Sequence, residues 1–188
     1  HAMIPDVLVA SGGDGTVNTV ANVAAQTGRV MAVLPTGTFN HFCKDIKVPA
    51  ILDEAISIAV DGEVQNLDYA TVNGYAFVNS SSIGAYPEAI LTRENLRDSL
   101  TKMTAMAVAI VKTAQANETM RITITANGKS QTLDTPSVFI GNNLYDLEGV
   151  GVPVRNRLQD GLLGVYILEA GSIGDLLAAG LFAFAGKQ

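Results

Sequence analysis

Ser11-Gly12-Gly13-Asp14-Gly15-Thr16-Val17-Asn18 follows directly on the apolar run Val7-Leu8-Val9-Ala10. After it, apolar residues recur at helical spacing until Gly28, where we expect the helix to end. A strand, a glycine-rich loop and a helix in this order form an anion site, because backbone N–H groups at the positive end of a helix can turn toward one phosphate. We expect the glycines to supply backbone conformations that other residues avoid. The pattern predicts a nucleotide-binding loop.

A second loop of the same kind follows the next apolar run. Residues 30–34 read as a buried strand, and Pro35-Thr36-Gly37-Thr38-Phe39-Asn40 comes next. Two such loops at the carboxyl ends of neighbouring parallel strands converge where open α/β sheets bind ligands. The alternative is geometric: many βα connections need glycine, and Gly37 with Asn40 could form a simple turn in which Gly37 supplies backbone freedom.

Together these loops resemble the catalytic region of the diacylglycerol kinase and sphingosine kinase superfamily. The resemblance rests on the first loop and residues 34–42, and it continues through residues 79–84, 141–143 and 158–165. The first loop is also similar to that of NAD kinases and phosphofructokinases, whereas the second loop favours the lipid kinases. Thr19 and His41 depart from the commonest family pattern, which has an acidic residue at each position; we expect His41 to start a helix or lie on the surface.

The resemblance implies which residues contact ATP and Mg²⁺. The implied nucleotide-binding residues are Gly12, Gly13, Asp14, Gly15, Thr16 and Asn18 in the first loop and Gly37, Thr38 and Asn40 in the second. Asp14 could orient the loop or reach a metal through water, and it could also cap the helix that follows. Asp160 stands where relatives bind a structural Mg²⁺ through an aspartate and backbone carbonyls; a metal-free Asp-Gly turn is the alternative. We assign no catalytic base, because the family segment that carries it does not occur here.

The expected fold class is α/β plus β-sandwich. Residues 4–64 are predicted to form a partial parallel α/β nucleotide-binding domain, in which residues 50–60 are a helix with Ile51, Ala55, Ile56 and Ala59 inward. Residues 65–188 are predicted to form a mainly antiparallel β-sandwich, lipid-binding domain with helices. Asn73-Gly74 and Asn127-Gly128 each predict a type I′ hairpin turn, and strands are expected at residues 137–141 and 163–168. The apolar part of a predicted helical region, residues 86–116, could form one wall of a lipid cleft.

Composition restricts the partners. The net charge of −6 argues against nucleic-acid binding, because neutralising phosphates needs clustered Lys and Arg. Cys43 is the only cysteine, so it has no internal disulfide partner; we expect it to be buried or inert, and the chain to be cytoplasmic. The sequence has no secretory leader and no apolar run long enough to span a bilayer, so any membrane contact is expected to be peripheral.

The resemblance implies an ATP-dependent lipid kinase that transfers the γ-phosphate to a lipid hydroxyl, as in diacylglycerol. Because the family's preceding nucleotide loop and its base-bearing segment are absent, we expect this chain to be a fragment without turnover. The alternatives are an NAD kinase-like enzyme and a non-catalytic module that binds lipid or nucleotide. The edges of so short a parallel sheet favour self-association, so a homo-oligomer is possible. Asn142, Asn143, Asp146 and Glu148 form a polar cluster without an assigned role.

Overall fold

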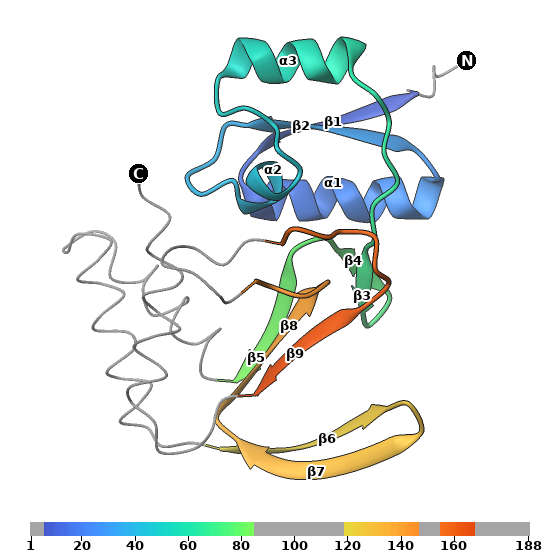
Figure 1. The fold of residues 1–188 in the computed structure, drawn as a ribbon, viewed down its shortest axis with the longest axis vertical. Coiled ribbons are helices and arrows are strands. Elements are labelled where there is room, and N and C mark those ends of the chain that lie inside the picture. The colour runs from blue at the N-terminus through green and yellow to red at the C-terminus, as the bar shows by residue number, and fades with distance from the viewer. Residues whose placement is uncertain (1–5, 85–118, 147–154, 168–188) are drawn as a thin grey trace, which may run out of the picture. The chain divides into compact units, whose positions relative to one another are not determined.

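The computed structural model describes residues 6–84, 119–146 and 155–167 (Figure 1). The helical region predicted at residues 86–116 lies outside these ranges. The chain divides into two compact units: the first contains residues 1–81, 141–148 and 154–164, and the second contains residues 82–140, 149–153 and 165–188. This division differs from the predicted boundary at residue 64, because the hairpin that follows residue 64 packs on the first helix of the nucleotide-binding region.

The first unit contains a parallel strand pair covered by helices. Strand β1 (Val7–Gly12) pairs with β2 (Val30–Pro35) from Val7 opposite Val30 to Gly12 opposite Pro35. Helices α1 (Asp14–Thr27) and α3 (Leu52–Asp61) lie on opposite sides of this pair (Figure 1). Helix α1 ends as predicted at Gly28, whose φ of 65° is left-handed and whose N–H bonds to the Ala24 carbonyl. The short helix α2 (His41–Asp45) follows the second glycine loop.

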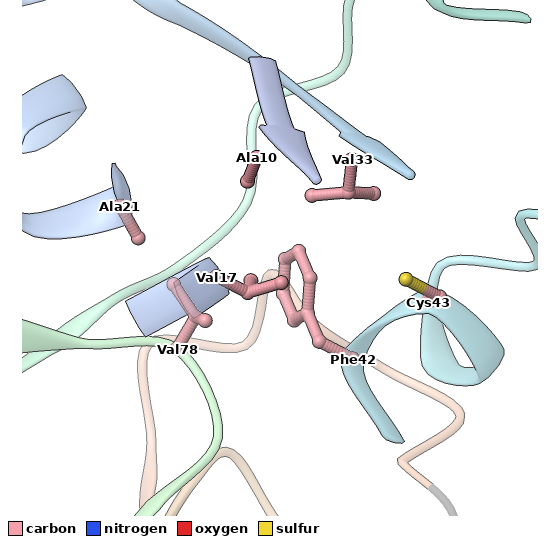
Figure 2. Close-up of a cluster of buried hydrophobic side chains, with 7 residues drawn as sticks. All are labelled: Ala10, Val17, Ala21, Val33, Phe42, Cys43 and Val78. Atoms are coloured by element: carbon pink, nitrogen blue, oxygen red, sulfur yellow. The ribbon is translucent and has the colours of Figure 1, made fainter. Parts of the chain in front are cut away.

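The core of this unit lies between the strand pair, α1 and α2 (Figure 2). Its buried members are Ala10, Val17, Ala21, Val33, Phe42, Cys43 and Val78. Cys43 is buried, as predicted, and burial together with the nearby Asp14 charge raises the pKa of its thiol. The prediction for α3 is wrong at two positions: Ala55 is buried, but Ile51 and Ile56 are exposed. Ala55 is the one residue of α3 that is fully buried, and Ala59, which was also predicted to face inward, is half-buried.

Both predicted hairpins are confirmed. Strands β3 (Ala70–Val72) and β4 (Tyr75–Phe77) flank Asn73 and Gly74, and β6 (Met120–Ala126) and β7 (Lys129–Thr135) flank Asn127 and Gly128. All four turn residues have positive φ, as a type I′ turn requires.

The remaining strands are β5 (Ser80–Gly84), β8 (Ser137–Asn142) and β9 (Leu163–Ile167), which form a three-stranded sheet in the order β5-β8-β9. Strands β8 and β9 were predicted from the sequence. We missed β5 because Ser80-Ser81-Ser82 shows no alternation of apolar and polar residues. The described fold is therefore mixed α/β with several sheets. No helix within it is long and apolar enough to cross a membrane.

Candidate functional site: two glycine loops and a buried polar network

The two glycine loops touch each other where β1 and β2 end. The hydroxyl oxygens of Ser11 and Thr36 are 3.3 Å apart and share a hydrogen bond. A Cβ atom added to Gly37 would lie 2.2 Å from the Cα of Gly13 and 2.6 Å from its backbone nitrogen. Only glycine at residue 37 permits this approach, so the predicted convergence of the loops is present in the structure.

The glycines of the loops provide space rather than unusual backbone angles. Gly12, Gly13, Gly15 and Gly37 all have ordinary φ values, so the expectation of special conformations is wrong at these positions. Gly12 instead makes room for Thr16, because its Cβ would lie 2.5 Å from the Thr16 Oγ1 atom. Gly15 differs from the other three: it is exposed, and a Cβ there would meet nothing within 4 Å. It leaves open surface at the first turn of α1, where backbone N–H groups have no partner within the helix.

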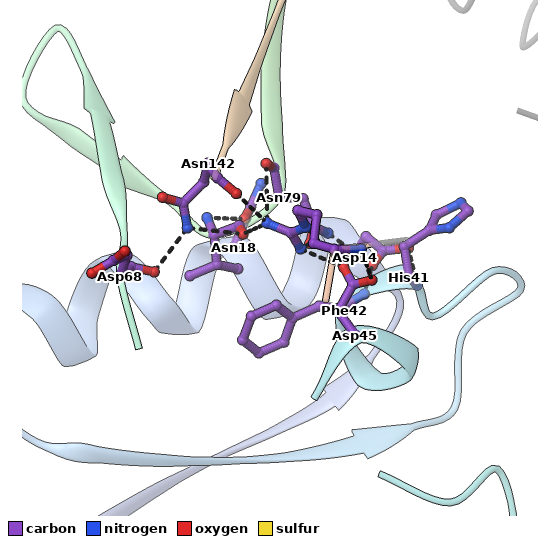
Figure 3. A network of polar contacts seen from close by, with 10 residues as sticks. Asp14, Asn18, His41, Phe42, Asp45, Asp68, Asn79 and Asn142 are labelled. Carbon is purple, nitrogen blue, oxygen red and sulfur yellow. Dashed lines mark hydrogen bonds and ion pairs between the residues drawn. The ribbon is translucent and has the colours of Figure 1, made fainter. Parts of the chain in front are cut away.

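Asp14 connects the first loop to the second. Its carboxylate accepts hydrogen bonds from the backbone N–H groups of His41 at 3.2 Å and Phe42 at 3.0 Å, which begin α2 (Figure 3). Asp14 therefore caps α2 and not, as the alternative had it, the helix that follows it in sequence. The N-cap residue of α1 is Gly13, which has no side chain to make a capping bond. Asp14 therefore orients the second loop relative to the first, which is the other role that the sequence analysis gave it.

Two of the predicted ligand residues already bond to the protein. Asn18 Oδ1 accepts the N–H of Val78 at 3.1 Å, and one turn later Asn22 Oδ1 accepts that of Ala76 at 2.8 Å. Asn40, with a left-handed φ of 52°, accepts the N–H of Gly37 at 3.0 Å and donates to the carbonyls of Pro35 and Gly37. The turn-forming role that we weighed for Asn40 is therefore present, whereas Gly37 is required for space.

The remaining members of the two loops face solvent or begin a helix. Thr16 and Thr38 are exposed. Thr19 donates its hydroxyl to the Gly15 carbonyl at 3.0 Å. His41 starts α2, as expected, and its ring stacks on Phe39 with centroids 5.7 Å apart.

A buried network that the sequence analysis missed lies behind Asp14. Arg155, 1% exposed, donates to the Asp45 carboxylate at 2.6 and 2.9 Å and to Asn79 Oδ1 at 2.8 Å. It also donates to the carbonyls of Val78 and Asn142. Asn79 in turn donates its Nδ2 to Asp14 Oδ1 at 2.9 Å (Figure 3). No local motif marks Arg155, since Asp45 is 110 residues away in sequence.

The loop that contains Asp160 has a mixed set of polar groups. A carboxylate oxygen of Asp160 lies 3.1 Å from Nε of Arg157. Asp68 Oδ2 accepts bonds at 2.7 Å from Asn143 Nδ2 and from the Gly161 N–H, and these bonds, with Asn143 contributing most, hold the pKa of Asp68 below its usual value. Asn143 Oδ1 is buried and has no donor. Within the described ranges, no three His, Cys, Asp or Glu side chains gather as a metal site would need.

The described geometry is that of an α/β domain with two parallel strands, whose following loops meet at the exposed first turn of a helix. Comparison with known proteins shows which proteins of this fold the chain resembles. Residues 2–72 match the family model described as "Diacylglycerol kinase catalytic domain". A protein of Serratia proteamaculans (strain 568), "Probable lipid kinase YegS-like", is 30% identical over 183 residues, which are 93% of this chain and 59% of that protein.

A second relative and a solved structure are also described as diacylglycerol kinases. "Diacylglycerol kinase" of Staphylococcus epidermidis (strain RP62A) is 37% identical over 81 residues, which are 42% of this chain and 26% of that protein. A crystal structure of a diacylglycerol kinase from Bacillus anthracis str. Sterne aligns with a TM-score of 0.64 and 26% identity, over 97% of this chain and 59% of that one. The chain is similar to diacylglycerol kinases and other lipid kinases, in agreement with the resemblance seen in the sequence. It spans 59% of the length of the Serratia relative.

Proposed function

We propose that the protein to which this chain belongs is an ATP-dependent lipid kinase that transfers the γ-phosphate to a hydroxyl group of a lipid of the diacylglycerol type. Similarity to lipid kinases along nearly the whole chain supports this proposal. The observation that carries it is the open surface at Gly15, beside the contact between Gly13 and Gly37. A phosphate needs close approach to backbone N–H groups, and a position without a Cβ at the exposed start of a helix permits it.

The proposal gives the loop residues different roles. The backbone N–H groups of residues 13–16 hold phosphate oxygens, and the exposed hydroxyls of Thr16 and Thr38 add donors. Asp14 keeps the second loop against the first through its bonds to α2. Asn18 and Asn40 support the site through the bonds they make to Val78 and to the second loop, and not by binding the nucleotide directly. Phosphoryl transfer depends mainly on such positioning and on neutralising charge.

For Mg²⁺ we retain Asp160 as a proposed ligand. A hard cation prefers oxygen donors, and the same region contains the donor-free Asn143 Oδ1 atom. Arg157, which now pairs with Asp160, has a side chain that is 77% exposed, so it can leave the carboxylate at little cost. When bound, the ion would supply positive charge that fixes this loop. A Mg²⁺ titration that shifts the NMR signals of residues 157–162 would support the assignment, and unchanged signals at millimolar Mg²⁺ would contradict it.

We further propose that residues 65–188 include the antiparallel β-sandwich and the lipid-binding region, with peripheral membrane contact in the cytoplasm. The β6–β7 hairpin and the sheet β5-β8-β9 support this proposal. Self-association through the edge of the β1–β2 pair is part of the same proposal, since in the described part of the chain this sheet has two strands and each has one unpaired edge. Light scattering that gives a monomer at all concentrations would contradict self-association.

The test is a phosphotransfer assay on the longest natural protein that contains this sequence. Labelled ATP and Mg²⁺ are supplied with either vesicles containing a short-chain diacylglycerol or with NAD. We expect labelled phosphatidic acid and no labelled NADP; the reverse would establish the NAD kinase alternative, and nucleotide binding without either product the non-catalytic one. The same assay on the 188 residues alone decides whether they lack turnover, which remains a prediction.

A matched pair of variants locates the site. Gly15→Asp places a negative charge where we expect phosphate, whereas Thr19→Asp places the same charge one turn later on the same face of α1. Acidic residues near a helix N-terminus do not destabilise it, so both variants should fold. We expect Gly15→Asp to abolish nucleotide binding and Thr19→Asp to retain it. Equal effects would show that the phosphates do not bind at the first turn of α1.

A further inference from the structure

Arg155 is a buried cation whose hydrogen-bonding capacity is used completely. Its guanidinium has five N–H groups, and their acceptors are Asp45, Asn79 Oδ1 and the carbonyls of Val78 and Asn142. Its Cζ atom also lies 5.4 Å from the centre of the Tyr145 ring. Burying an ion pair gives little net stability, because removing two charges from water costs about as much as their attraction returns. We therefore look for the role of Arg155 in the geometry that it imposes on its neighbours, and not in net stability.

The neighbour whose geometry matters most is Asn79. An amide side chain can turn over and exchange its oxygen and nitrogen. Arg155 only donates and the Asp14 carboxylate only accepts, so Asn79 must present Oδ1 to Arg155 and Nδ2 to Asp14. Arg155 therefore selects the orientation in which Asn79 can bond to Asp14.

The fixed position of the Asp14 carboxylate in turn fixes the two loops relative to each other. Its carboxylate receives Asn79 Nδ2 and the Phe42 N–H on Oδ1 and the His41 N–H on Oδ2. Because α2 begins directly after the second glycine loop, a fixed Asp14 holds the end of the second loop against the start of the first. A carboxylate that lost Asn79 would be free to rotate away from the α2 N–H groups.

We propose that Arg155 is a positioning residue of the nucleotide site, which acts through Asn79 on the Asp14 carboxylate and so sets the spacing of the two glycine loops. The ligand in this inference rests on the proposed function, whereas the relay from Arg155 to Asp14 can be tested without any ligand. The two tests below separate these parts.

The first test compares Arg155→Lys with Asn142→Ala in this chain. Lysine keeps the charge near Asp45 but cannot also reach Asn79 and two carbonyls. Asn142→Ala removes two side-chain hydrogen bonds, a part-buried one to the Asp68 carbonyl and a buried one to the Val78 carbonyl, and neither involves the Asn79 or Asp14 side chain. It keeps the Asn142 backbone carbonyl that accepts from Arg155. Dissociation constants for Mg²⁺·AMP-PNP are measured by calorimetry at a temperature at which circular dichroism shows both variants folded. We expect Arg155→Lys to weaken binding about tenfold, the loss of one charge-assisted hydrogen bond, and Asn142→Ala to change it about twofold or less.

Equal weakening by the two variants would overturn the proposal, because it would trace the effect to general destabilisation. Full binding by Arg155→Lys would overturn it as well. If the unaltered chain fails to bind Mg²⁺·AMP-PNP, the proposed function has failed for this chain, and the relay is then decided by the second test alone.

The second test exchanges the two partners of the relay. Asn79→Asp sets two carboxylates against each other and should lower the melting temperature. The double variant Asp14→Asn/Asn79→Asp restores a donor–acceptor pair in the opposite sense, but Asp14→Asn also gives up one acceptor for the α2 N–H groups. The double variant is therefore compared with both single variants: coupling predicts a fall in melting temperature smaller than the sum of the two single falls. Falls that simply add would show that residues 14 and 79 are not coupled, and would overturn the relay.

Discussion

The two glycine loops and the network around Arg155 are both polar regions of the first unit, but they are built in opposite ways. The loops are exposed in part and consist of two short stretches that meet each other at the ends of two neighbouring strands. The Arg155 network is buried and joins residues up to 110 positions apart. Under the proposed function, ligand contact and structural support are divided between them: the open surface belongs to backbone and glycine, and the buried charges hold that backbone in place.

The largest expected difference between the regions is in stability. Arg155→Met leaves Asp45 buried and unpaired, and we expect it to lower the free energy of unfolding by about 3–5 kcal/mol. The control is Arg157→Met, which breaks an exposed pair with Asp160 and should cost about 0–1 kcal/mol. Urea denaturation measures both. Similar small losses in both variants would mean that Arg155 does not support the unit.

The next effect sharpens the comparison inside the loops. Gly37→Ala drives a Cβ into the backbone of Gly13, and we expect a loss of about 1–3 kcal/mol, as for other overpacked sites. Gly15→Ala meets no atom and replaces glycine within a helix, so it should gain up to about 1 kcal/mol. Thermal unfolding of the pair checks this. A larger loss of stability in Gly15→Ala than in Gly37→Ala would contradict the open space at Gly15 and the close contact at Gly37.

Asn18 and Asn22 test whether the surface of α1 binds ligand or only protein. Each accepts one N–H of the segment from Ala76 to Val78, so each alanine variant should cost about 1 kcal/mol. We expect the affinity for Mg²⁺·AMP-PNP to be alike in the two variants. A much weaker affinity in Asn18→Ala alone would restore Asn18 to the nucleotide-binding set that the resemblance implies.

The smallest expected effect is a pH dependence from Asp68. Its bonds to Asn143 and Gly161 lower its pKa in the folded state, so the ionised form is favoured by folding. The stability it contributes is present above its usual value of 3.8 and is lost as pH falls through the lowered folded value. The stability difference between the unaltered chain and Asp68→Asn should therefore shrink below pH 3.8. A difference that grew on acidification would contradict this assignment.

Local features were predictable from the sequence because local physics decides them. Both Asn-Gly hairpins, the end of α1 at Gly28 and the convergence of the loops follow from turn chemistry and apolar spacing. The exposure of Ile51 and Ile56 was not predictable, since the spacing of α3 does not say how much partner surface it meets. Arg155 and Asp45 were missed, and Asn79 was noted only as part of the resemblance, because a buried polar network is defined by tertiary contact and no spacing in the chain marks it.

The proposed function depends above all on phosphate binding at the exposed first turn of α1, beside the Gly37 loop. The most direct measurement is a ¹H–¹⁵N NMR titration of this chain with Mg²⁺·AMP-PNP. We predict that the largest amide shifts fall on residues 13–16 and 36–38. Saturable shifts concentrated elsewhere, with these amides unchanged, would contradict the claim.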